Sequence, residues 1–324
     1  MNGVGSAGSE RGFALLVTLW VVIILMTIVM SLSLLAKAEA YATLYFRQSF
    51  AARLLAEAGL ERAIMEIYYR QANMSKTIIP ESGEAVRVDG TEIEGALGDD
   101  RYIVRIFNEA GRININTMND QNKVIFNNLL VSLGVLKETA DTIVDSALDW
   151  MDKDNLHRLH GAEDEHYQSL PNPYKAKNAP FDTAEELLLV KGVTEDILFG
   201  TKERNGLIQF ITVYGNSSRI NVNVAPKEVL MALPDMTEET ADRIISQRLL
   251  GELRSLEDVR GLMGALYDGA SGYIDTGESM SFTIESSGIR KNGGSGYGIR
   301  ATVVVQSGGE YRYVSYKTPA EVRR

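Results

Sequence analysis

The chain contains no cysteine and only three histidines among its 324 residues. Disulfide bonds, iron–sulfur clusters and thiolate zinc sites are therefore excluded. Basic residues are also in the minority, because 33 lysines and arginines face 43 aspartates and glutamates, which gives a net charge of −10. This balance works against tight binding to nucleic-acid backbones or anionic lipid headgroups. No nucleophile elbow or HExxH metalloprotease motif occurs, so nothing in the sequence indicates an enzyme.

A long uncharged segment near the start of the chain departs from this soluble composition. The run from Phe13 to Ala36 contains no charged residue. As a helix rising 1.5 Å per residue it would extend about 36 Å, which is enough to cross a bilayer. It is also longer than the apolar core of a cleaved secretory signal, which spans about 7–15 residues. The sequence therefore predicts a single-span membrane anchor.

The helix is expected to continue beyond the membrane. No proline occurs between Ala36 and Arg70, and apolar residues recur there at spacings of three and four. We expect one helix that is apolar in its first half, amphipathic in its second, and packed on a small antiparallel sheet. The strand patterns lie at both ends of the remaining chain: a hairpin at 85–95 turning at Asp89-Gly90, then 101–107, 281–287, 299–306 and 311–317.

Two strings in the middle of the chain occur twice. RININT at 112–117 is matched by RINVNV at 219–224, and ETADTIV at 138–144 is matched by ETADRII at 239–245. Because two separate strings recur in the same order, we infer an internal duplication. Helical patterns surround both copies, and Pro226 suits the first turn of a helix. The region 117–277 is therefore expected to hold two related helical modules, each introduced by a short extended segment.

Three features together resemble a known family. The junction ERGFALLV at 10–17 is similar to the processing site of type IV prepilin-like proteins, with a leader that would end at Gly12 and a mature chain that would begin at Phe13. A long helix followed by an antiparallel sheet resembles the pilin fold. The repeated RIN-x-N strings, with DWMDKDN, GAEDEHY and ELLLVKGVT, resemble the general secretion pathway protein K family, the large minor pseudopilins of type II secretion.

The resemblance implies an α+β fold. A pilin-like unit, made of the long N-terminal helix and an antiparallel sheet, would carry a large inserted all-α domain with duplicated SAM-like or helix-hairpin-helix-like modules. The expected parts are a leader at 1–12, the transmembrane half of the helix at 13–36, the amphipathic helix and first part of the sheet at 37–116, the inserted domain at 117–277, and closing strands at 278–324.

The resemblance also implies a structural function rather than an enzymatic one. Most prepilin-like proteins carry glutamate at the fifth mature position, where it is thought to meet the terminal amine of the subunit above; in this chain the position is Val17. A charge inside the membrane is costly, and a subunit with nothing above it has no use for one. We therefore expect a minor pseudopilin at the pseudopilus tip, which helps to initiate assembly and blocks further addition above it.

The partners implied by the resemblance are other minor pseudopilins, contacted through the N-terminal helix, a prepilin peptidase and the inner-membrane secretion platform. The chain would sit in the bacterial inner membrane as a single-pass protein, with Phe13 methylated and the C-terminal domain in the periplasm. The alternative is a membrane-tethered DNA-binding protein, because the sequence at 232–248 resembles a helix-hairpin-helix unit. Asp235 and Met236 replace its expected Gly-Ile there, and Glu238 and Glu239 add negative charge, so no nucleic acid is expected.

Ligand-capable side chains are densest between residues 149 and 166. The resembled family holds calcium in its helical domain, and calcium takes six to eight oxygens from carboxylates, carbonyls and water. We therefore expect a structural calcium site. Two alternatives remain, a solvated acidic loop and a zinc site, because His157, His160 and His166 all lie in this stretch. The expected calcium ligands are Asp149, Asp152, Asp154, Glu163 and Asp164.

Overall fold

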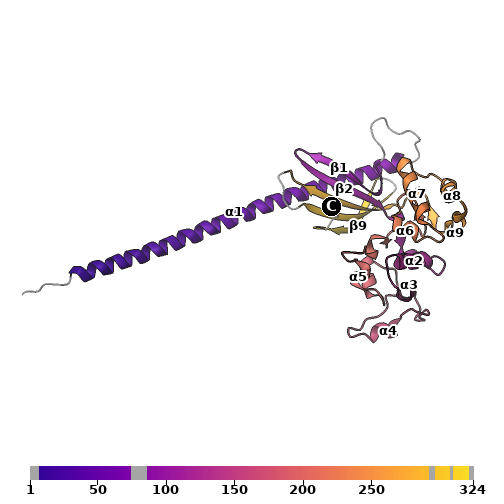
Figure 1. Cartoon of the computed structure of the whole chain (residues 1–324), viewed down its shortest axis with the longest axis horizontal. Helices are drawn as coiled ribbons and strands as arrows, with labels where there is room; N and C mark the ends of the chain where they lie inside the picture. The colour runs from indigo at the N-terminus through magenta and orange to yellow at the C-terminus, as the bar shows by residue number, and fades with distance from the viewer. Residues whose placement is uncertain (1–6, 74–85, 292–295, 307–308, 321–324) are drawn as a thin grey trace, which may run out of the picture.

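The structure is a computed structural model that describes residues 7–73, 86–291, 296–306 and 309–320. Helix α1 (Ala7–Asn73) is a rod of 67 residues that projects from a broad head (Figure 1). Its length is about 100 Å at 1.5 Å per residue. The expectation of one continuous helix running from the apolar segment into the head is confirmed.

A five-stranded antiparallel sheet forms the part of the head that touches the rod. The strand order is β1-β2-β7-β8-β9, so strands from both ends of the head region lie side by side. Each strand pairs antiparallel with its neighbours. The strands are β1 (Asp89–Leu97), β2 (Asp100–Asn108), β7 (Ser281–Ile289), β8 (Tyr297–Val305) and β9 (Tyr311–Lys317).

The second half of α1 packs on one face of this sheet, along β7 and its neighbours β2 and β8. Burial recurs at the helical spacing from Ala52 to Ile67, as the amphipathic pattern predicts. The approach is very close at Gly288, where an added Cβ would lie 1.9 Å from the carbonyl oxygen of Ala52 and 2.8 Å from the amide nitrogen of Ala56. Only a residue without a side chain lets the strand and the helix backbone meet at this distance.

The expected hairpin turn at Asp89-Gly90 is wrong. Asp89 and Gly90 begin β1, and the chain reverses at Gly98-Asp99, since Leu97 pairs with Asp100. Gly98 supplies the positive φ of 64° that such a tight turn needs. Asp89 is occupied locally instead: its carboxylate pairs with Arg87 and accepts hydrogen bonds from Thr91.

The inserted region between β2 and β7 is mostly helical but is not all-α, which corrects the sequence expectation. Two short parallel strand pairs lie inside it, β3 with β4 and β5 with β6. The strands are β3 (Ile113–Asn114), β4 (Ile211–Thr212), β5 (Ile220–Asn221) and β6 (Ile274–Asp275). Each RIN-x-N string is extended at its Ile-Asn pair, where the isoleucine is buried and the backbone pairs with a second segment.

The helices of the region fall into two consecutive sets that follow the two strings. After β3 come α2 (Lys123–Ser132), α3 (Lys137–Met151), α4 (Asp164–Gln168), the 3-10 helix η3 (Ala184–Leu189), α5 (Glu195–Leu198) and η4 (Leu207–Gln209). After β5 come α6 (Lys227–Met231), α7 (Glu238–Leu250), α8 (Leu256–Met263), η5 (Gly264–Leu266) and α9 (Tyr267–Ala270). Short 3-10 helices, η1 (Glu109–Gly111) and η2 (Ile115–Thr117), flank β3.

Asn116 and Asn223, the last asparagines of the two strings, share one pair of hydrogen bonds, and Asn116 also donates to the carbonyl oxygen of Val213 at 3.1 Å. Asn116 donates through Nδ2 to the carbonyl oxygen of Phe181 at 2.9 Å and accepts from the Phe181 amide at 2.7 Å. Asn223 does the same with Leu253, at 2.9 Å in both directions. Two backbone groups inside the head are satisfied in each case by one amide side chain. Each asparagine therefore links its string to a later segment of the same module, and we call this pair of hydrogen bonds a latch.

Removing either latch is expected to destabilise the head by a similar amount. Asn116→Ala and Asn223→Ala each leave an amide N–H and a carbonyl oxygen without their partner, which costs about 2–4 kcal/mol in total. Denaturant unfolding of a fragment that begins near residue 37 measures the effect. Asn128→Ala serves as the control, since its side chain makes a single bond to the carbonyl of Ala232. A loss confined to one of the two latch variants would contradict their equivalence.

Several contacts hold the inserted region to the sheet and to the rod. Asn108 at the end of β2 bonds in both directions to the Ser279 backbone, so the two chain crossings into the inserted region are tied together. Val224, the last residue of the second string, belongs to the apolar core under the sheet. Arg70, 5% exposed near the end of α1, donates to Glu278 at 2.7 Å and to Glu252 at 2.5 Å. These contacts fix the inserted region relative to α1.

Candidate functional site

The densest group of ionisable side chains lies in a segment present in only one of the two modules. In the first module, residues 152–180 separate the end of α3 from Phe181; in the second, only Gly251 and Glu252 separate the end of α7 from Leu253. Because Phe181 and Leu253 are the equivalent partners of the two latch asparagines, 152–180 is an insertion in the first module. It lies at the end of the head that carries α4 (Figure 1).

Three carboxylates of the insertion converge. Ligand oxygens of Asp152, Asp154 and Glu163 all lie within 4.8 Å of one another. Glu163 is 3% exposed, and within the described residues neither of its carboxylate oxygens has a hydrogen-bond partner. Burial, followed by the charges of the surrounding aspartates, raises the pKa of Glu163 to about 7. A buried carboxylate with two unsatisfied oxygens beside other carboxylates is an arrangement that a cation would stabilise.

The remaining two predicted ligands are engaged differently. Asp149, fully buried at the end of α3, accepts from Nη1 of Arg158 at 2.6 Å and from the Arg158 amide at 3.0 Å. Burial nevertheless raises the pKa of Asp149 above its usual value. Asp164 lies 3.4 Å from Lys175 and accepts from the amide of Ala176. The structure therefore brings three of the five predicted residues together. Asp149 lies beside them but is paired with the guanidinium of Arg158.

Arg158 was not predicted from the sequence. Its Nη1 also bonds to Asp152 at 2.7 Å, so one guanidinium bridges the buried Asp149 and a member of the cluster. The neighbouring carboxylates raise the pKa of Arg158 despite its partial burial. No periodicity places residue 158 opposite residue 149, because the chain between them is irregular. The available signal was an arginine within a stretch rich in acidic residues.

The three histidines do not contribute to the cluster. Nδ1 of His157 lies 2.9 Å from the carbonyl oxygen of Arg158, and the amide of His160 donates to Asp145. The ring of His166 packs edge-on against Tyr167 instead. An all-oxygen group of carboxylates fits calcium, whereas zinc sites in proteins are usually built from nitrogen and sulfur ligands. The donor set thus favours the calcium expectation over the zinc alternative.

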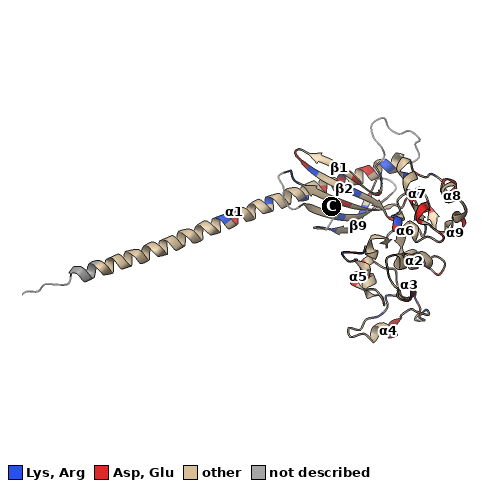
Figure 2. Cartoon of the chain, viewed as in Figure 1, with Lys and Arg blue, Asp and Glu red and all other residues tan. Residues whose placement is uncertain are grey.

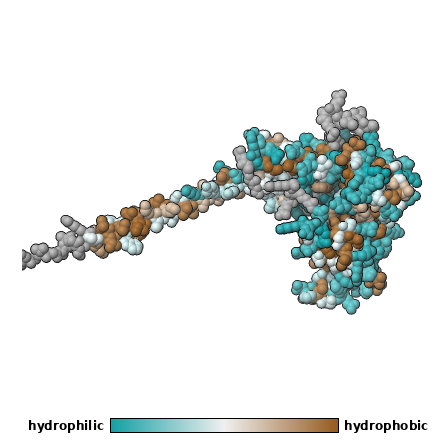
Figure 3. Space-filling model, viewed as in Figure 1, coloured by the Kyte–Doolittle hydropathy of each residue, from teal (hydrophilic) through white to brown (hydrophobic). Residues whose placement is uncertain are grey.

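The first half of α1 is the second candidate site. Gly12 is exposed with open space around it, Phe13 is 72% exposed and Val17 is 45% exposed. None of the side chains in the most apolar stretch of the helix is buried, and the helix is long and apolar enough to cross a membrane. Between Gly12 and Ala36 the rod carries no charged residue, and blue and red segments appear farther along it (Figure 2), while the visible face of this stretch is mostly apolar (Figure 3). Such a surface requires lipid or other helices around it.

The turn that resembles a helix-hairpin-helix unit is electrostatically unsuited to phosphate. Asp235 occupies its turn with a positive φ of 58°. Lys227, the nearby cation, is paired with Glu238 at 2.9 Å and with Asp242 at 2.7 Å. Glu239 adds further negative charge in the first turn of α7. A DNA backbone would therefore be repelled, and nothing in this turn favours the alternative of a DNA-binding protein.

The described arrangement defines a class of protein: a long N-terminal helix laid half on an antiparallel sheet, with helices inserted between the strands. A solved structure confirms this fold. The GspK–GspI–GspJ complex from the type 2 secretion system of enterotoxigenic Escherichia coli contains a chain that this one matches with a TM-score of 0.57. The match covers 88% of this chain and 99% of that chain at 15% identity, so it establishes the fold alone.

Sequence comparisons point to one family. Two models described as type II secretion system protein K match residues 111–202 and 220–272. Type II secretion system protein K of Pectobacterium carotovorum is 30% identical over 173 residues, and that of Pseudomonas aeruginosa is 30% identical over 162 residues. The chain spans about half the length of these curated relatives, 50% and 46%. Over the matched residues the chain is therefore similar to the type II secretion system protein K family.

Proposed function

We propose that this chain is a minor pseudopilin of a type II protein secretion system, a structural subunit and not an enzyme. The observation that carries the proposal is the division of α1. Residues 52–67 bury their apolar stripe on the chain's own sheet, whereas the apolar residues from Phe13 to Leu35 are exposed. An exposed apolar rod of this length is stable in lipid or against other helices, and not alone in water. Similarity to the type II secretion system protein K family supports the same assignment.

The proposal places the chain at the tip of the pseudopilus. The inserted region lies at the end of α1 that is farthest from the apolar segment, where it adds bulk around the end of the rod (Figure 1). A further subunit stacked above would have to displace it. Val17 supplies no carboxylate for the terminal amine of such a subunit. The bulk and the missing charge both favour a terminal position, from which the chain helps to initiate assembly.

The partners and the location follow from this role. Other minor pseudopilins would pack on the exposed part of α1, as the presence of two further proteins in the related complex supports. A prepilin peptidase would cut after Gly12 and methylate Phe13, and the inner-membrane platform would take up the mature chain. The head would then lie in the periplasm. The duplicated modules, which share their latch geometry, would serve as protein-packing units of the SAM-like kind.

We also propose a structural calcium ion at the carboxylate cluster. Asp152, Asp154 and Glu163 would hold it, with backbone carbonyls and water completing the six to eight oxygens that calcium takes. The buried, unpartnered oxygens of Glu163 are the observation that supports this site. When bound, the ion would neutralise the cluster and tie the insertion to the end of α3. Its contribution would be to stability, with no part in a reaction.

The processing site tests the proposed function. Gly12→Leu is expected to block cleavage, so the chain retains residues 1–12, and to lower secretion of an exported protein at least tenfold. N-terminal sequencing of the membrane-extracted chain gives the first readout and activity of the exported protein in the medium gives the second. Gly8→Leu, which adds the same bulk inside the leader, should be cleaved normally. Efficient processing and secretion by the Gly12 variant would overturn the assignment.

A further inference from the structure

The internal duplication allows the burial of equivalent residues to be compared between the two modules. Helix α3 of the first module corresponds to α7 of the second, aligned by the string ETAD at 138–141 and 239–242. All residues from Ile143 to Trp150 are buried, but among their counterparts from Ile244 to Gly251 only Ile244 and Arg248 are. The same helix face is therefore inside the protein in one module and in water in the other.

In the first module the insertion covers the end of α3. Arg158 and the amide of His160 bond to Asp149 and Asp145 of α3. The ring of Tyr167 packs edge-on against Trp150 with centroids 5.3 Å apart. The second module has no such segment, since only Gly251 and Glu252 follow α7 before Leu253. Its α7 lacks a cover from its own chain among the described residues.

The consequence is concentrated at two leucines. Leu148 is 4% exposed in the first module, whereas its counterpart Leu249 is 63% exposed; Asp149 is fully buried, whereas its counterpart Leu250 is 85% exposed. Single exposed leucines are ordinary on protein surfaces. Two adjacent ones at the positions that the sister module buries are different, because the same fold shows that a polypeptide segment fits there.

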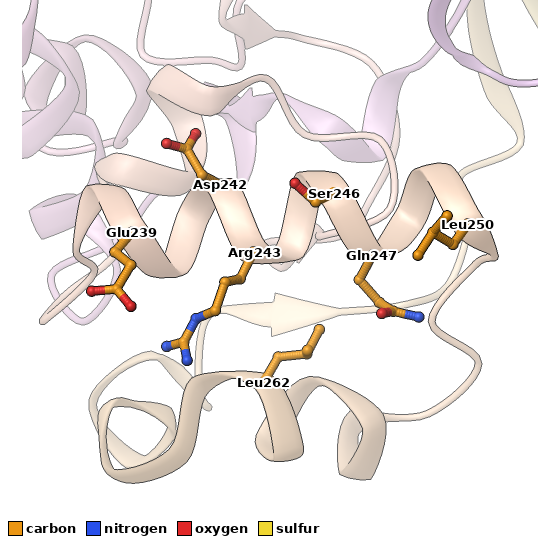
Figure 4. Close-up of a pocket in the computed structure, with 7 residues that line it drawn as sticks. All are labelled: Glu239, Asp242, Arg243, Ser246, Gln247, Leu250 and Leu262. Atoms are coloured by element: carbon orange, nitrogen blue, oxygen red, sulfur yellow. The ribbon is translucent and has the colours of Figure 1, made fainter.

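A groove continues from these leucines along α7. It has a volume of about 410 Å³ and lies between α7 and α8. Arg243 and Gln247 reach from α7 toward α8, and Leu262 rises from α8 to meet them, while Leu250 stands at one end (Figure 4). At the opposite end the acidic residues Glu238, Glu239 and Asp242 outnumber the basic residues Lys227 and Arg243, and Lys227 pairs with Glu238 and Asp242. The face is thus apolar at one end and net acidic at the other.

We propose that this face, formed by α7 from Glu239 to Leu250 and by Leu262 of α8, is the docking surface for a neighbouring subunit of the same pseudopilus tip. The partner would insert a segment with adjacent aliphatic or aromatic side chains over Leu249 and Leu250, and a basic residue toward Glu239. It would supply in trans the cover that residues 152–180 supply to the first module. The proposal rests on the proposed function, since it names the partner of a tip subunit.

A permanent subunit fits this surface better than a protein in transit. Leu249 and Leu250 are exposed to water whenever the partner is absent, so a protein that binds only transiently would leave both exposed for most of the time. The cover in the first module is continuous with the chain and always present. The apolar and acidic ends also lie on one straight helix, which suits a single extended or helical segment running alongside α7.

Photo-crosslinking in the intact membrane tests the assignment with the full chain. Leu250→p-benzoylphenylalanine is expected to form an adduct with a pilin-like subunit, identified by mass spectrometry. Leu136→p-benzoylphenylalanine is the matched control, since Leu136 is also a leucine of the head and is 78% exposed; it should form no adduct with that subunit. Phe50→p-benzoylphenylalanine, on the half-exposed part of α1, reports separately on the proposed packing of the rod.

The three probes separate the outcomes. An adduct from Phe50 but none from Leu250 would overturn the docking surface and leave the proposed function standing, whereas adducts from neither would overturn both. A secreted protein as the Leu250 adduct, or an equal yield from Leu136, would also overturn the docking proposal. In a second measurement, Leu249→Ser with Leu250→Ser should lower co-purification of the partner from detergent extracts at least tenfold. The thermal midpoint should stay unchanged, because both side chains already face water.

Discussion

Replacing Gly288 with alanine is expected to lower the stability of the head by about 3 kcal/mol, the upper part of the range for overpacking a core. The added methyl group would lie 1.9 Å from the carbonyl oxygen of Ala52 and 2.8 Å from the amide nitrogen of Ala56. Both atoms belong to the backbone of α1, so no rotamer change relieves the clash. The helix must move away from β7, and the apolar core between them opens.

The matched control for Gly288→Ala is Gly261→Ala. Gly261 lies in the exposed part of α8, and an added Cβ would meet nothing within 4 Å. The same chemical change should raise stability there by up to about 1 kcal/mol, because alanine favours helix and glycine does not. Denaturant unfolding of a fragment starting near residue 37 compares the two. Equal effects of the same sign would contradict the close packing of α1 on β7.

Removing calcium is expected to lower the thermal midpoint of the head by about 10 °C. An ion present at a thousand times its dissociation constant contributes about 4 kcal/mol. Each kcal/mol shifts the midpoint of a unit of this size by about 2–4 °C. Differential scanning calorimetry before and after treatment with a chelator measures the change. A midpoint that chelation leaves unaltered would show that the cluster of Asp152, Asp154 and Glu163 holds no structural ion.

The effect of Glu163→Gln on the thermal midpoint should have opposite signs with calcium bound and with calcium removed. With calcium present it removes a buried ligand and lowers the midpoint. In chelator at pH 8 it should raise the midpoint above that of the natural protein, because Glu163, with a pKa of about 7, is then ionised, buried and without a partner. Glu165→Gln, which neutralises an exposed carboxylate two residues away, should do neither. A loss of stability in both conditions would point to a packing role for Glu163.

The sequence predicted the elements that repeat a simple period. The helix from the apolar run to Arg70, the closing strands and the two modules all follow from spacing or from internal repetition, and the structure places them as expected. The hairpin turn was misplaced because Asp89-Gly90 has the composition of a turn, although its side chain is committed to Arg87 and Thr91. Local composition could not show that the Asp89 carboxylate binds these side chains at the start of β1 and not in a turn.

The candidate site was predicted in composition and only partly in geometry. Asp152, Asp154 and Glu163 meet because the insertion folds back on α3, and irregular chain carries no period from which that return can be inferred. Arg158 was missed for the same reason. The exposure of Leu249 and Leu250 was also invisible in the sequence, since leucine is usually buried and Leu249 aligns with the buried Leu148.

The joint at the far end of α1 has a mechanical consequence. Arg70 ties the last turns of the helix to Glu252 and Glu278, and Asn108 ties together the two chain crossings next to that joint. Because these described contacts hold the head on α1, a force applied at the apolar end of the helix would be transmitted along it into the head. Any protein in contact with the head would therefore receive that force directly.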